Sequence, residues 1–322
     1  MIVPLSRWAN ARAAADLPLA VGPAISTASA FMECPLPQFV LNVVAQNAVA
    51  LSPALRELGE ARWLAQGRAF DIAVSGDVQA TLADVRRRFT SADINLISVE
   101  NRRKKLLVAD MDSTIIGCEC IDELADMVGL KAKVAAITER AMRGEIAFER
   151  ALRERVALLA GLPLAALERV YHERVRLNPG AKTLVATMRA HGAKTILVSG
   201  GFTFFTQRVA AAAGFDTNQA NVLLDDGTNL SGLVKEPILG REAKLEALVH
   251  AVQTDNLAFA HTLAVGDGAN DLGMIARAGL GVAYHAKPIV AEAAGATIAH
   301  NDLTALLYLQ GYREEEIVRF ED

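Results

Sequence analysis

Two aspartates stand one residue apart where an apolar run ends. Asp110 and Asp112 follow the run 106–109 and precede the polar residues Ser113 and Thr114. Both carboxylates can flank one reacting group if the backbone turns directly after the strand, as a polar pair allows. An aspartate can attack phosphorus as a covalent nucleophile, and a second one can protonate the leaving oxygen. The pair therefore indicates phosphoryl chemistry, with a plain strand-end turn as the structural alternative.

A calcium-binding loop can also begin with two acidic residues at this spacing. Such a loop requires glycine at its sixth position and glutamate at its twelfth. Ile115 and Ile121 occupy those positions here. The sequence therefore excludes a calcium loop of this kind.

A second polar segment follows the apolar run 195–198, which ends in Ser199, Gly200 and Gly201. Glycine lets backbone N–H groups approach a ligand closely, and these groups together with a hydroxyl suit phosphate oxygens. A serine-hydrolase elbow would require glycine where Leu197 stands, so we do not expect Ser199 to be a nucleophile. An ordinary turn between a strand and a helix is again the alternative.

Two further features carry charge or metal-binding potential. Lys244 lies on an expected helix, where its ammonium could face a transferring phosphoryl group, although most helical lysines are solvated. Another apolar run ends in the segment 266–271, which contains Asp267, Asn270 and Asp271. Carboxylate and amide oxygens suit a hard cation, and Mg²⁺ usually takes one or two protein carboxylates beside water and phosphate.

In their order along the chain, these features resemble the four signatures of the haloacid dehalogenase-like phosphatases: 110–114, 199–201, Lys244 and 266–271. The residues around them, together with the acidic segment 119–123, are similar to the branch of that family that acts on phosphoserine. The resemblance covers about residues 103–310 and leaves residues 1–100 outside it.

The resemblance implies a role for each matching residue. Asp110 would be the nucleophile that becomes an aspartyl-phosphate, and Asp112 the acid that protonates the serine oxygen and later activates water. Mg²⁺ would be held by the Asp110 carboxylate, the Asp112 backbone carbonyl and the Asp267 carboxylate, while Asp271 would order their loop from behind. The phosphoryl oxygens and substrate would be bound by a further set: Ser199, Gly200, Lys244 and Asn270.

The segment between Thr114 and Thr195 is much longer than a simple crossover between strands needs. Apolar residues recur there at helical spacing, glycines separate the periodic stretches, and Pro163 suits a first helical turn. We expect four helices, which would form a small cap at about 121–178 over the site: 121–129, 131–142, 145–159 and 164–174.

In the family such a cap closes over the substrate. The resemblance implies that Glu119 meets the substrate ammonium and Arg155 its carboxylate, which a planar guanidinium can hold with two hydrogen bonds. Met142 and Phe148 would shield the site from water. The alternative for Met142 and Phe148 is ordinary cap core, and for Glu119 and Arg155 it is a solvated surface pair.

A second domain is expected before residue 100. The patterning predicts strands and helices in the order β-α-β-β-α-β, which is the ferredoxin-like pattern: strands 39–45, 61–64, 70–74 and 94–99, a helix after Ser52-Pro53 and a helix over 78–89. This α+β pattern resembles the ACT domain, a small amino-acid-binding regulatory domain. We expect residues 1–100 to form a regulatory or dimerisation domain, irregular over 1–35, and residues 101–322 to form the phosphatase domain.

The composition is typical of a globular enzyme. The 322 residues are 52% hydrophobic but only 5% aromatic, which indicates cores of Ala, Leu and Val. A net charge of −4 leaves no electrostatic footprint for nucleic acid, and no stretch reaches the length of a membrane helix. Cys34, Cys118 and Cys120 match neither a disulfide framework nor a zinc site, which favours reduced thiols and a cytoplasmic protein. The Ala/Leu-rich start resembles a secretory signal, but charged, proline and glycine residues interrupt it.

Together, the resemblance implies an α/β protein with a Rossmann-like parallel sheet, an inserted helical cap and the N-terminal domain. It would hydrolyse O-phospho-L-serine to L-serine and phosphate with Mg²⁺, the last step of serine biosynthesis. Two alternatives stay open: a related small-molecule phosphomonoesterase or phosphotransferase, and a non-catalytic amino-acid-sensing protein. We also expect serine to act as an effector and the chain to form a homodimer, without nucleic-acid or membrane partners.

Overall fold

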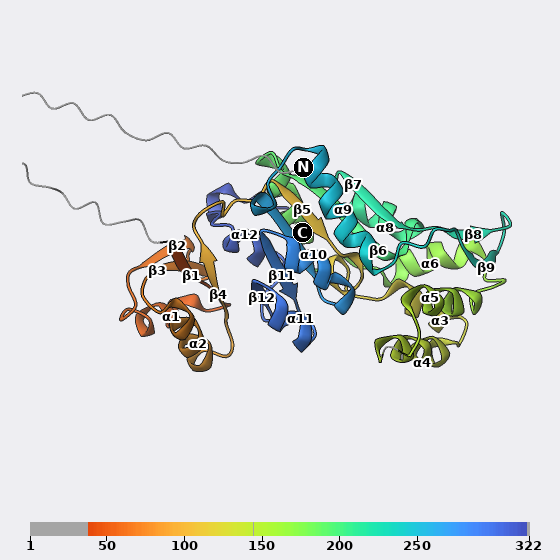
Figure 1. Cartoon of the computed structure of the whole chain (residues 1–322), viewed down its shortest axis with the longest axis horizontal. Coiled ribbons are helices and arrows are strands. Elements are labelled where there is room, and N and C mark those ends of the chain that lie inside the picture. Colours follow the sequence, from red (N-terminus) through yellow and green to blue (C-terminus); the bar gives the residue numbers. More distant parts are fainter. Residues whose placement is uncertain (1–37, 144, 321–322) are drawn as a thin grey trace, which may run out of the picture. The chain divides into compact units, whose positions relative to one another are not determined.

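The computed structural model describes residues 38–143 and 145–320. Its central element is a six-stranded parallel sheet with the order β12-β11-β10-β5-β6-β7 (Figure 1). The strands are β5 (Leu106–Ala109), β6 (Lys194–Phe202), β7 (Thr217–Asn221), β10 (Thr262–Gly266), β11 (Leu280–Tyr284) and β12 (Ala296–Ile298). The three strands that carry the polar motifs, β10, β5 and β6, are neighbours, so their carboxyl ends meet at one edge. The expected α/β parallel-sheet core is confirmed.

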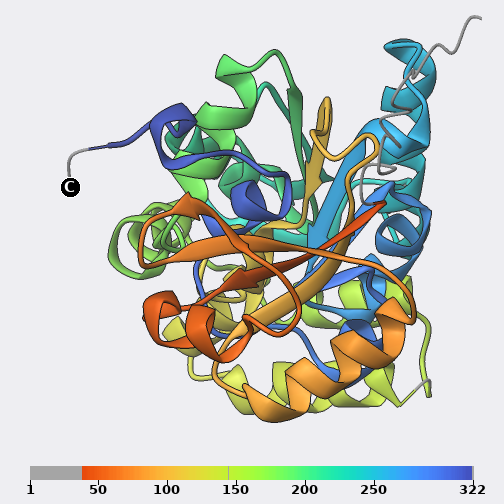
Figure 2. The same cartoon turned by 90° about the vertical axis from the view of Figure 1, so that its left-hand side faces the viewer.

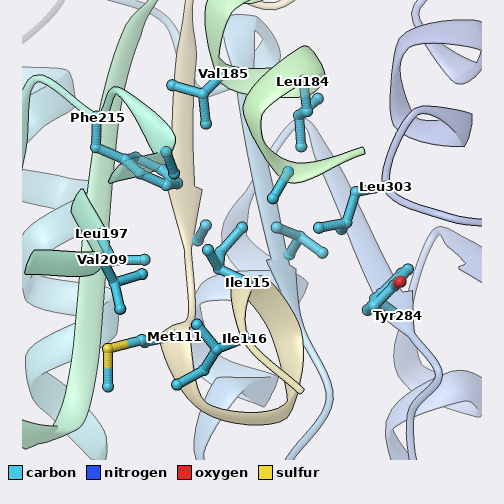
Figure 3. Close-up of a cluster of buried hydrophobic side chains, with 14 of the residues drawn as sticks. Met111, Ile115, Ile116, Leu184, Val185, Leu197, Val209, Phe215, Tyr284 and Leu303 are labelled. Carbon is cyan, nitrogen blue, oxygen red and sulfur yellow. The ribbon is translucent and has the colours of Figure 1, made fainter. Parts of the chain in front are cut away.

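Helices cover both faces of this sheet, so the central strands β5, β10 and β11 are buried along their whole length and are mostly apolar. Leu107 of β5 contributes to a core with helices α7 (Ala181–Ala190), α8 (Thr203–Ala213) and α12 (Ala305–Leu309) (Figure 3). Leu106 and Val108 contribute to the core on the other face of the sheet, together with three further helices: α9 (Arg241–Thr254), α10 (Leu272–Arg277) and α11 (Pro288–Ala293). The alternation follows from the twofold period of a strand.

The expected cap helices are present between β5 and β6. They are α3 (Cys120–Met127), α4 (Lys131–Met142), α5 (Phe148–Ala157) and α6 (Leu164–Arg174). All four agree with the sequence prediction to within three residues at each end. The chain enters and leaves the cap side by side, because Ile116 and Leu177 form an antiparallel bridge and the Gly117 N–H donates to the Arg176 carbonyl.

A short hairpin, which the sequence analysis did not predict, also packs on the cap. Strands β8 (Leu223–Asp225) and β9 (Leu230–Val234) pair antiparallel after β7. The Gly161 N–H donates to the Leu230 carbonyl, and a Cβ on Gly232 would lie 2.8 Å from the Ala160 Cβ. Glycine at position 232 therefore permits the hairpin to approach α5 closely.

The predicted β-α-β-β-α-β order is present before residue 100. It consists of β1 (Phe39–Val44), α1 (Ala48–Ala54), β2 (Ala61–Ala65), β3 (Ala69–Val74), α2 (Val78–Arg88) and β4 (Asp93–Ser98), in an antiparallel sheet ordered β2-β3-β1-β4 (Figure 2). The first helix was placed wrongly, because it begins at Ala48 and contains Pro53 in its last turn. Ala48 is buried and donates to the Gly67 carbonyl, which sets the start of the helix, whereas proline lacks an N–H and favours its end. The segment 1–35, with Cys34 and the signal-like start, lies outside the described residues.

The N-terminal sheet shares a core with the catalytic domain. Leu41 and Val43 of β1 belong to an apolar cluster that also contains Val85 of α2. Val40 and Val44 belong instead to the apolar core of the parallel sheet. Asn42 lies between these two valines in the sequence and is buried with them. The two sheets therefore fold around a common apolar interior.

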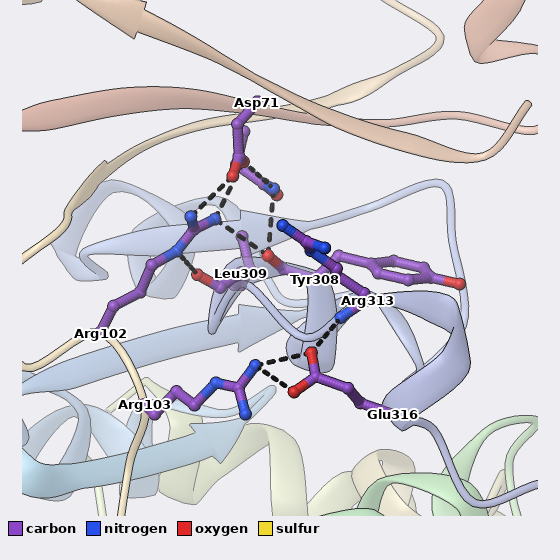
Figure 4. A network of polar contacts seen from close by, with 8 residues as sticks. Asp71, Arg102, Arg103, Tyr308, Leu309, Arg313 and Glu316 are labelled. Carbon is purple, nitrogen blue, oxygen red and sulfur yellow. Dashed lines mark hydrogen bonds and ion pairs between the residues drawn. The ribbon is translucent and has the colours of Figure 1, made fainter. Parts of the chain in front are cut away.

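Buried polar contacts cross the same junction. The Arg102 guanidinium donates two hydrogen bonds to Asp71 of β3, at 2.6 and 2.9 Å, and also donates to the carbonyls of Tyr308 and Leu309 (Figure 4). The Asn42 amide adds bonds to Asp71 and to the Tyr308 carbonyl. In addition, the Asn95 amide of β4 bonds both the N–H and the carbonyl of Thr297 in β12.

Among the residues described, no helix is both long and apolar enough to span a membrane.

The buried pair of Asp71 and Arg102 should stabilise the whole unit. We expect Asp71→Asn to lower the free energy of unfolding by about 3–5 kcal/mol, because it leaves the guanidinium without its counter-charge. Asp84→Asn is the matched control, since Asp84 pairs with arginines on the exposed side of α2 and should cost about 1 kcal/mol or less. Urea unfolding of both variants measures the difference; equal losses would contradict the role of the buried pair.

Candidate active site

A tight turn follows β5 and carries both motif aspartates. Met111 and Ile115 of this turn are buried in the core and anchor it (Figure 3). Ser113 adopts a left-handed backbone conformation with φ of 58°, which reverses the chain directly after Asp112. The turn that the sequence analysis required is therefore present.

Lys244 lies between two carboxylates at the edge of the sheet. Its ammonium nitrogen is 2.5 Å from Asp110 Oδ1 and 2.6 Å from Asp271 Oδ1, and all three side chains are buried. Burial alone would lower the pKa of Lys244, but the adjacent Asp110 and Asp271 carboxylates raise it above its ordinary value. Lys244 thus stays charged, and it holds Asp110 in place.

The carboxylates of Asp110, Asp267 and Asp271 form an acidic cluster whose oxygens lie within 4.8 Å of one another. Burial, with a further contribution from Asp271, raises the pKa of Asp110 well above its ordinary value, and Lys244 opposes this rise. Burial and Asp271 likewise raise the pKa of Asp267 to about 6. Such crowding of hard oxygen donors fits a divalent cation, whose charge would offset the repulsion among them.

The structure thus brings together Asp110 and Asp267, the two carboxylates predicted to hold the metal. It also places the Asp271 carboxylate beside them, whereas Asp271 was predicted to lie behind the metal ligands. Asp271 does order its loop, because its Oδ2 accepts from the Gly268 N–H at 3.0 Å. The Asn270 amide lies against Gly268, where a Cβ would come within 2.4 Å of Asn270 Oδ1. Spacing alone could not show that Asp271 would share Lys244 with Asp110.

Asp112 is held by two donors on different elements. Its Oδ2 accepts from the Ser199 hydroxyl at 2.9 Å, and its Oδ1 accepts from the Cys120 backbone N–H, also at 2.9 Å. The Gly201 N–H in turn donates to Ser199 Oγ at 2.8 Å. Ser199 therefore orients Asp112 in this structure. The contribution of Cys120, a main-chain donor at the start of α3, was not predicted, because a backbone group leaves no signal in residue type.

The cap meets the glycine loop through Phe148. A Cβ on Gly200 would lie 3.1 Å from the Phe148 ring, so the first residue of α5 packs directly on this loop. Phe148 also packs against the main core. The side chain of Met142, the other predicted shield, lies outside the described part of the chain.

Glu119 and Arg155 both lie within electrostatic reach of Asp112. Glu119 accepts a hydrogen bond of 2.7 Å from the Ser113 hydroxyl. Its carboxylate reaches solvent, yet the surrounding protein excludes enough water, and Asp112 adds enough negative charge, to raise its pKa to about 7. Burial lowers the pKa of Arg155, against the electrostatic influence of Asp122, Glu119 and Asp112. Its contacts with Ala151 and Thr138, at 3.3 and 3.4 Å, are long.

Comparison with known proteins agrees with this geometry. Residues 107–276 match the haloacid dehalogenase-like hydrolase family. The chain is 49% identical over 210 residues to a phosphoserine phosphatase of Polaromonas sp. strain JS666, covering 64% of this chain and 89% of that protein. A probable phosphoserine phosphatase from Vibrio cholerae in unliganded form superposes with a TM-score of 0.72 at 31% identity, covering 87% of this chain and 88% of that one. A phospho-aspartyl intermediate analogue of phosphoserine phosphatase superposes with a TM-score of 0.60 at 37% identity, covering 64% of this chain and 98% of that one.

The fold and the site define a hydrolase with a Rossmann-like parallel-sheet core, whose acidic edge can hold a divalent cation beside a lysine and a glycine loop. The chain belongs to the haloacid dehalogenase-like hydrolase family.

Gly266 should be required for the acidic cluster. A Cβ at this position would lie 2.3 Å from Asp271 Cγ, so Gly266→Ala must displace that carboxylate. We expect this variant to bind Mg²⁺ about tenfold more weakly or worse, as measured by titration calorimetry. Gly273→Ala on α10 is the matched control, because its Cβ would meet Leu245 at an ordinary 3.6 Å. Unchanged Mg²⁺ affinity in Gly266→Ala would show that glycine at position 266 is not required for the Asp271 carboxylate to take part in the cluster.

Proposed function

We propose that this chain hydrolyses O-phospho-L-serine to L-serine and phosphate with Mg²⁺, through an aspartyl-phosphate on Asp110. The observation that carries the proposal is the unequal environment of the two aspartates. Asp110 contacts the Lys244 ammonium, whereas Asp112 is oriented by Ser199 and by the Cys120 N–H. The similarity to phosphoserine phosphatases, including an analogue of a phospho-aspartyl intermediate, supports it.

In the first half of the reaction, an Asp110 oxygen attacks phosphorus and the bond from phosphorus to the serine oxygen breaks. Asp112 donates its proton to that oxygen, so serine leaves as a neutral alcohol. Lys244 and the Gly200 N–H stabilise the charge on the phosphoryl oxygens, and the Ser199 hydroxyl joins them when its proton turns from Asp112 to the bound phosphoryl group. Since this charge is spread over three oxygens, oriented donors supply much of the catalysis.

In the second half, Asp112 accepts a proton from water as the water oxygen attacks phosphorus. The bond from phosphorus to Asp110 breaks, which releases phosphate and regenerates both aspartates. Mg²⁺, held by the Asp110 and Asp267 carboxylates and the Asp112 backbone carbonyl, would neutralise phosphoryl charge when bound. Asn270 and Asp271 keep the Asp267 loop in position.

The cap recognises the amino-acid part of the substrate. Glu119 binds the ammonium and Arg155 the carboxylate, and both residues adjoin the acidic cluster. Phe148, which packs on Gly200, excludes water from the phosphoryl group. Helices α3 to α6 support a cap of about 121–178 within a phosphatase domain of 101–322.

The remaining expectations stay part of the proposal. Residues 1–100 would form an ACT-like domain that responds to serine as an effector or mediates a homodimer. The cytoplasmic location predicted from the sequence belongs here as well. Assaying serine inhibition of the full chain, with and without substitutions in the N-terminal sheet, distinguishes an effector from product binding at the active site.

The two aspartates should respond differently to substitution. We expect Asp110→Asn to abolish turnover and phosphoenzyme formation, because the amide cannot form the acyl-phosphate bond. Asp112→Asn should lower kcat by about 10²–10⁴, the usual contribution of a general acid–base. Phosphate release and rapid-quench detection of phosphoenzyme measure both effects, and release near the wild-type rate in Asp110→Asn would refute the mechanism.

Specificity should depend on Arg155. We expect Arg155→Ala to lower kcat/KM for O-phosphoserine by the equivalent of about 2–5 kcal/mol, because the substrate carboxylate loses its charged partner. Turnover of an aryl phosphate, which lacks that carboxylate, should be spared. Arg153→Ala is the matched control on the same helix, since Arg153 pairs with Glu236 on the exposed side. Equal loss for both substrates would mean that Arg155 has a structural role only.

A further inference from the structure

Asp93, the first residue of β4 in the N-terminal sheet, is an unusually well-satisfied buried carboxylate. Its Oδ1 accepts from the Ala299 N–H at 2.7 Å and from the His300 N–H at 3.2 Å. Its Oδ2 accepts from the Asn301 N–H at 3.0 Å and from the Asn301 amide at 2.8 Å. One side chain of the N-terminal sheet thus sets the conformation of three consecutive residues after β12 in the catalytic domain.

The segment that contains Asp93's partners, 299–304, is linked through residues 285–287 to loop 266–271, the metal loop, which carries Asp267. The Asn301 carbonyl lies 3.0 Å from His285 Nε2, and the His285 N–H donates to the Ile298 carbonyl at 2.8 Å. His285 has a left-handed backbone, with φ of 44°, and directs the chain to Lys287. The Lys287 N–H donates to the Asp267 carbonyl at 3.3 Å, so this route ends on a residue of the acidic cluster.

The same segment is also linked to the turn that carries Asp110 and Asp112, the aspartate turn. The Leu303 N–H donates to the Pro179 carbonyl at 3.1 Å. Next to Pro179, the Asn178 amide donates to the Thr114 carbonyl at 2.7 Å, and its N–H donates to the Ile115 carbonyl at 2.8 Å. Short chains of hydrogen bonds therefore connect segment 299–304 with both catalytic loops.

We propose that Asp93 is a positioning residue for the phosphatase reaction, through which the N-terminal sheet holds the metal loop and the aspartate turn in register. The inference rests on the proposed function and adds to it a role for the N-terminal sheet that none of the catalytic motifs supplies. Asp93 touches no reacting atom and acts only through segment 299–304.

Asp71 offers a matched comparison in the same sheet. It is also a buried carboxylate that crosses to the catalytic domain, but its partners are Arg102 and Asn42, which lead to the carbonyls of Tyr308 and Leu309 in α12. None of these contacts reaches either catalytic loop. A purely stabilising role for the sheet would therefore make Asp93 and Asp71 equivalent.

The test compares Asp93→Asn with Asp71→Asn in the full chain. We expect both to lower the melting temperature, but only Asp93→Asn should lower kcat for O-phosphoserine and raise the Kd for Mg²⁺, each by about 3- to 10-fold. KM should stay within about twofold, because the cap residues that bind serine are not in this route. Titration calorimetry with Mg²⁺ and amide hydrogen exchange of 299–304 report on the loops without turnover.

Asn301→Ala provides a second variant that removes a donor to Asp93 and leaves no unpaired charge. It should change kcat and Mg²⁺ affinity in the same direction as Asp93→Asn, and the effect of the double variant should be smaller than the sum of the two single effects.

If Asp93→Asn fails to fold, Asn301→Ala with unchanged kcat and Mg²⁺ affinity overturns the inference. It is equally overturned if Asp93→Asn and Asp71→Asn behave alike. A wild-type chain that does not hydrolyse O-phosphoserine would instead refute the proposed function, while the Mg²⁺ and exchange measurements would still test Asp93.

Discussion

The contact of Lys244 with Asp110 and Asp271 is the interaction on which the rest of the site depends. Three carboxylates meet at a buried edge, where each would lose much of its hydration and repel the others. One ammonium between two of them keeps the edge stable before any cation or substrate arrives. Strand order brings β5 and β10 together, and α9 delivers the lysine, so three distant segments must all be in place for this contact to form.

The sequence predicted those features whose cause is local. Apolar runs ending in polar turns identified the strands that carry Asp110, Ser199 and Asp267, and helical spacing with glycine breaks located the cap helices. Features that depend on distant partners escaped. The hydrogen bond from the Cys120 N–H to Asp112, the sharing of Lys244 with Asp271, and the hairpin against α5 all arise from tertiary approach. The start of α1 at Ala48 was missed for the same reason, since its cause is a contact with Gly67 in the turn between β2 and β3.

The N-terminal sheet has the predicted order of elements, and it also packs closely against the residues that follow it. Its strand order follows from local patterning, and by that pattern alone it would be a separate module. Both faces of β1 are apolar, however, and one of them belongs to the interior of the catalytic domain. Asn42 and Asp71 are polar residues inside that shared interior, and their hydrogen bonds require exact partners from residues beyond position 100. Polar groups of this kind specify one docking geometry, because any other would leave them buried and unpaired.

The neck of the cap constrains how a ligand enters and leaves. Since Ile116 pairs with Leu177, the two connections of the cap cannot separate independently, and the hairpin against α5 adds a third attachment. A movement of the cap that lifts Phe148 from Gly200 would therefore involve the four helices together and would not require any of them to unfold. Under the proposed function, a cap tethered in this way would admit a free phosphorylated amino acid more readily than the same phosphorylated side chain within a polypeptide.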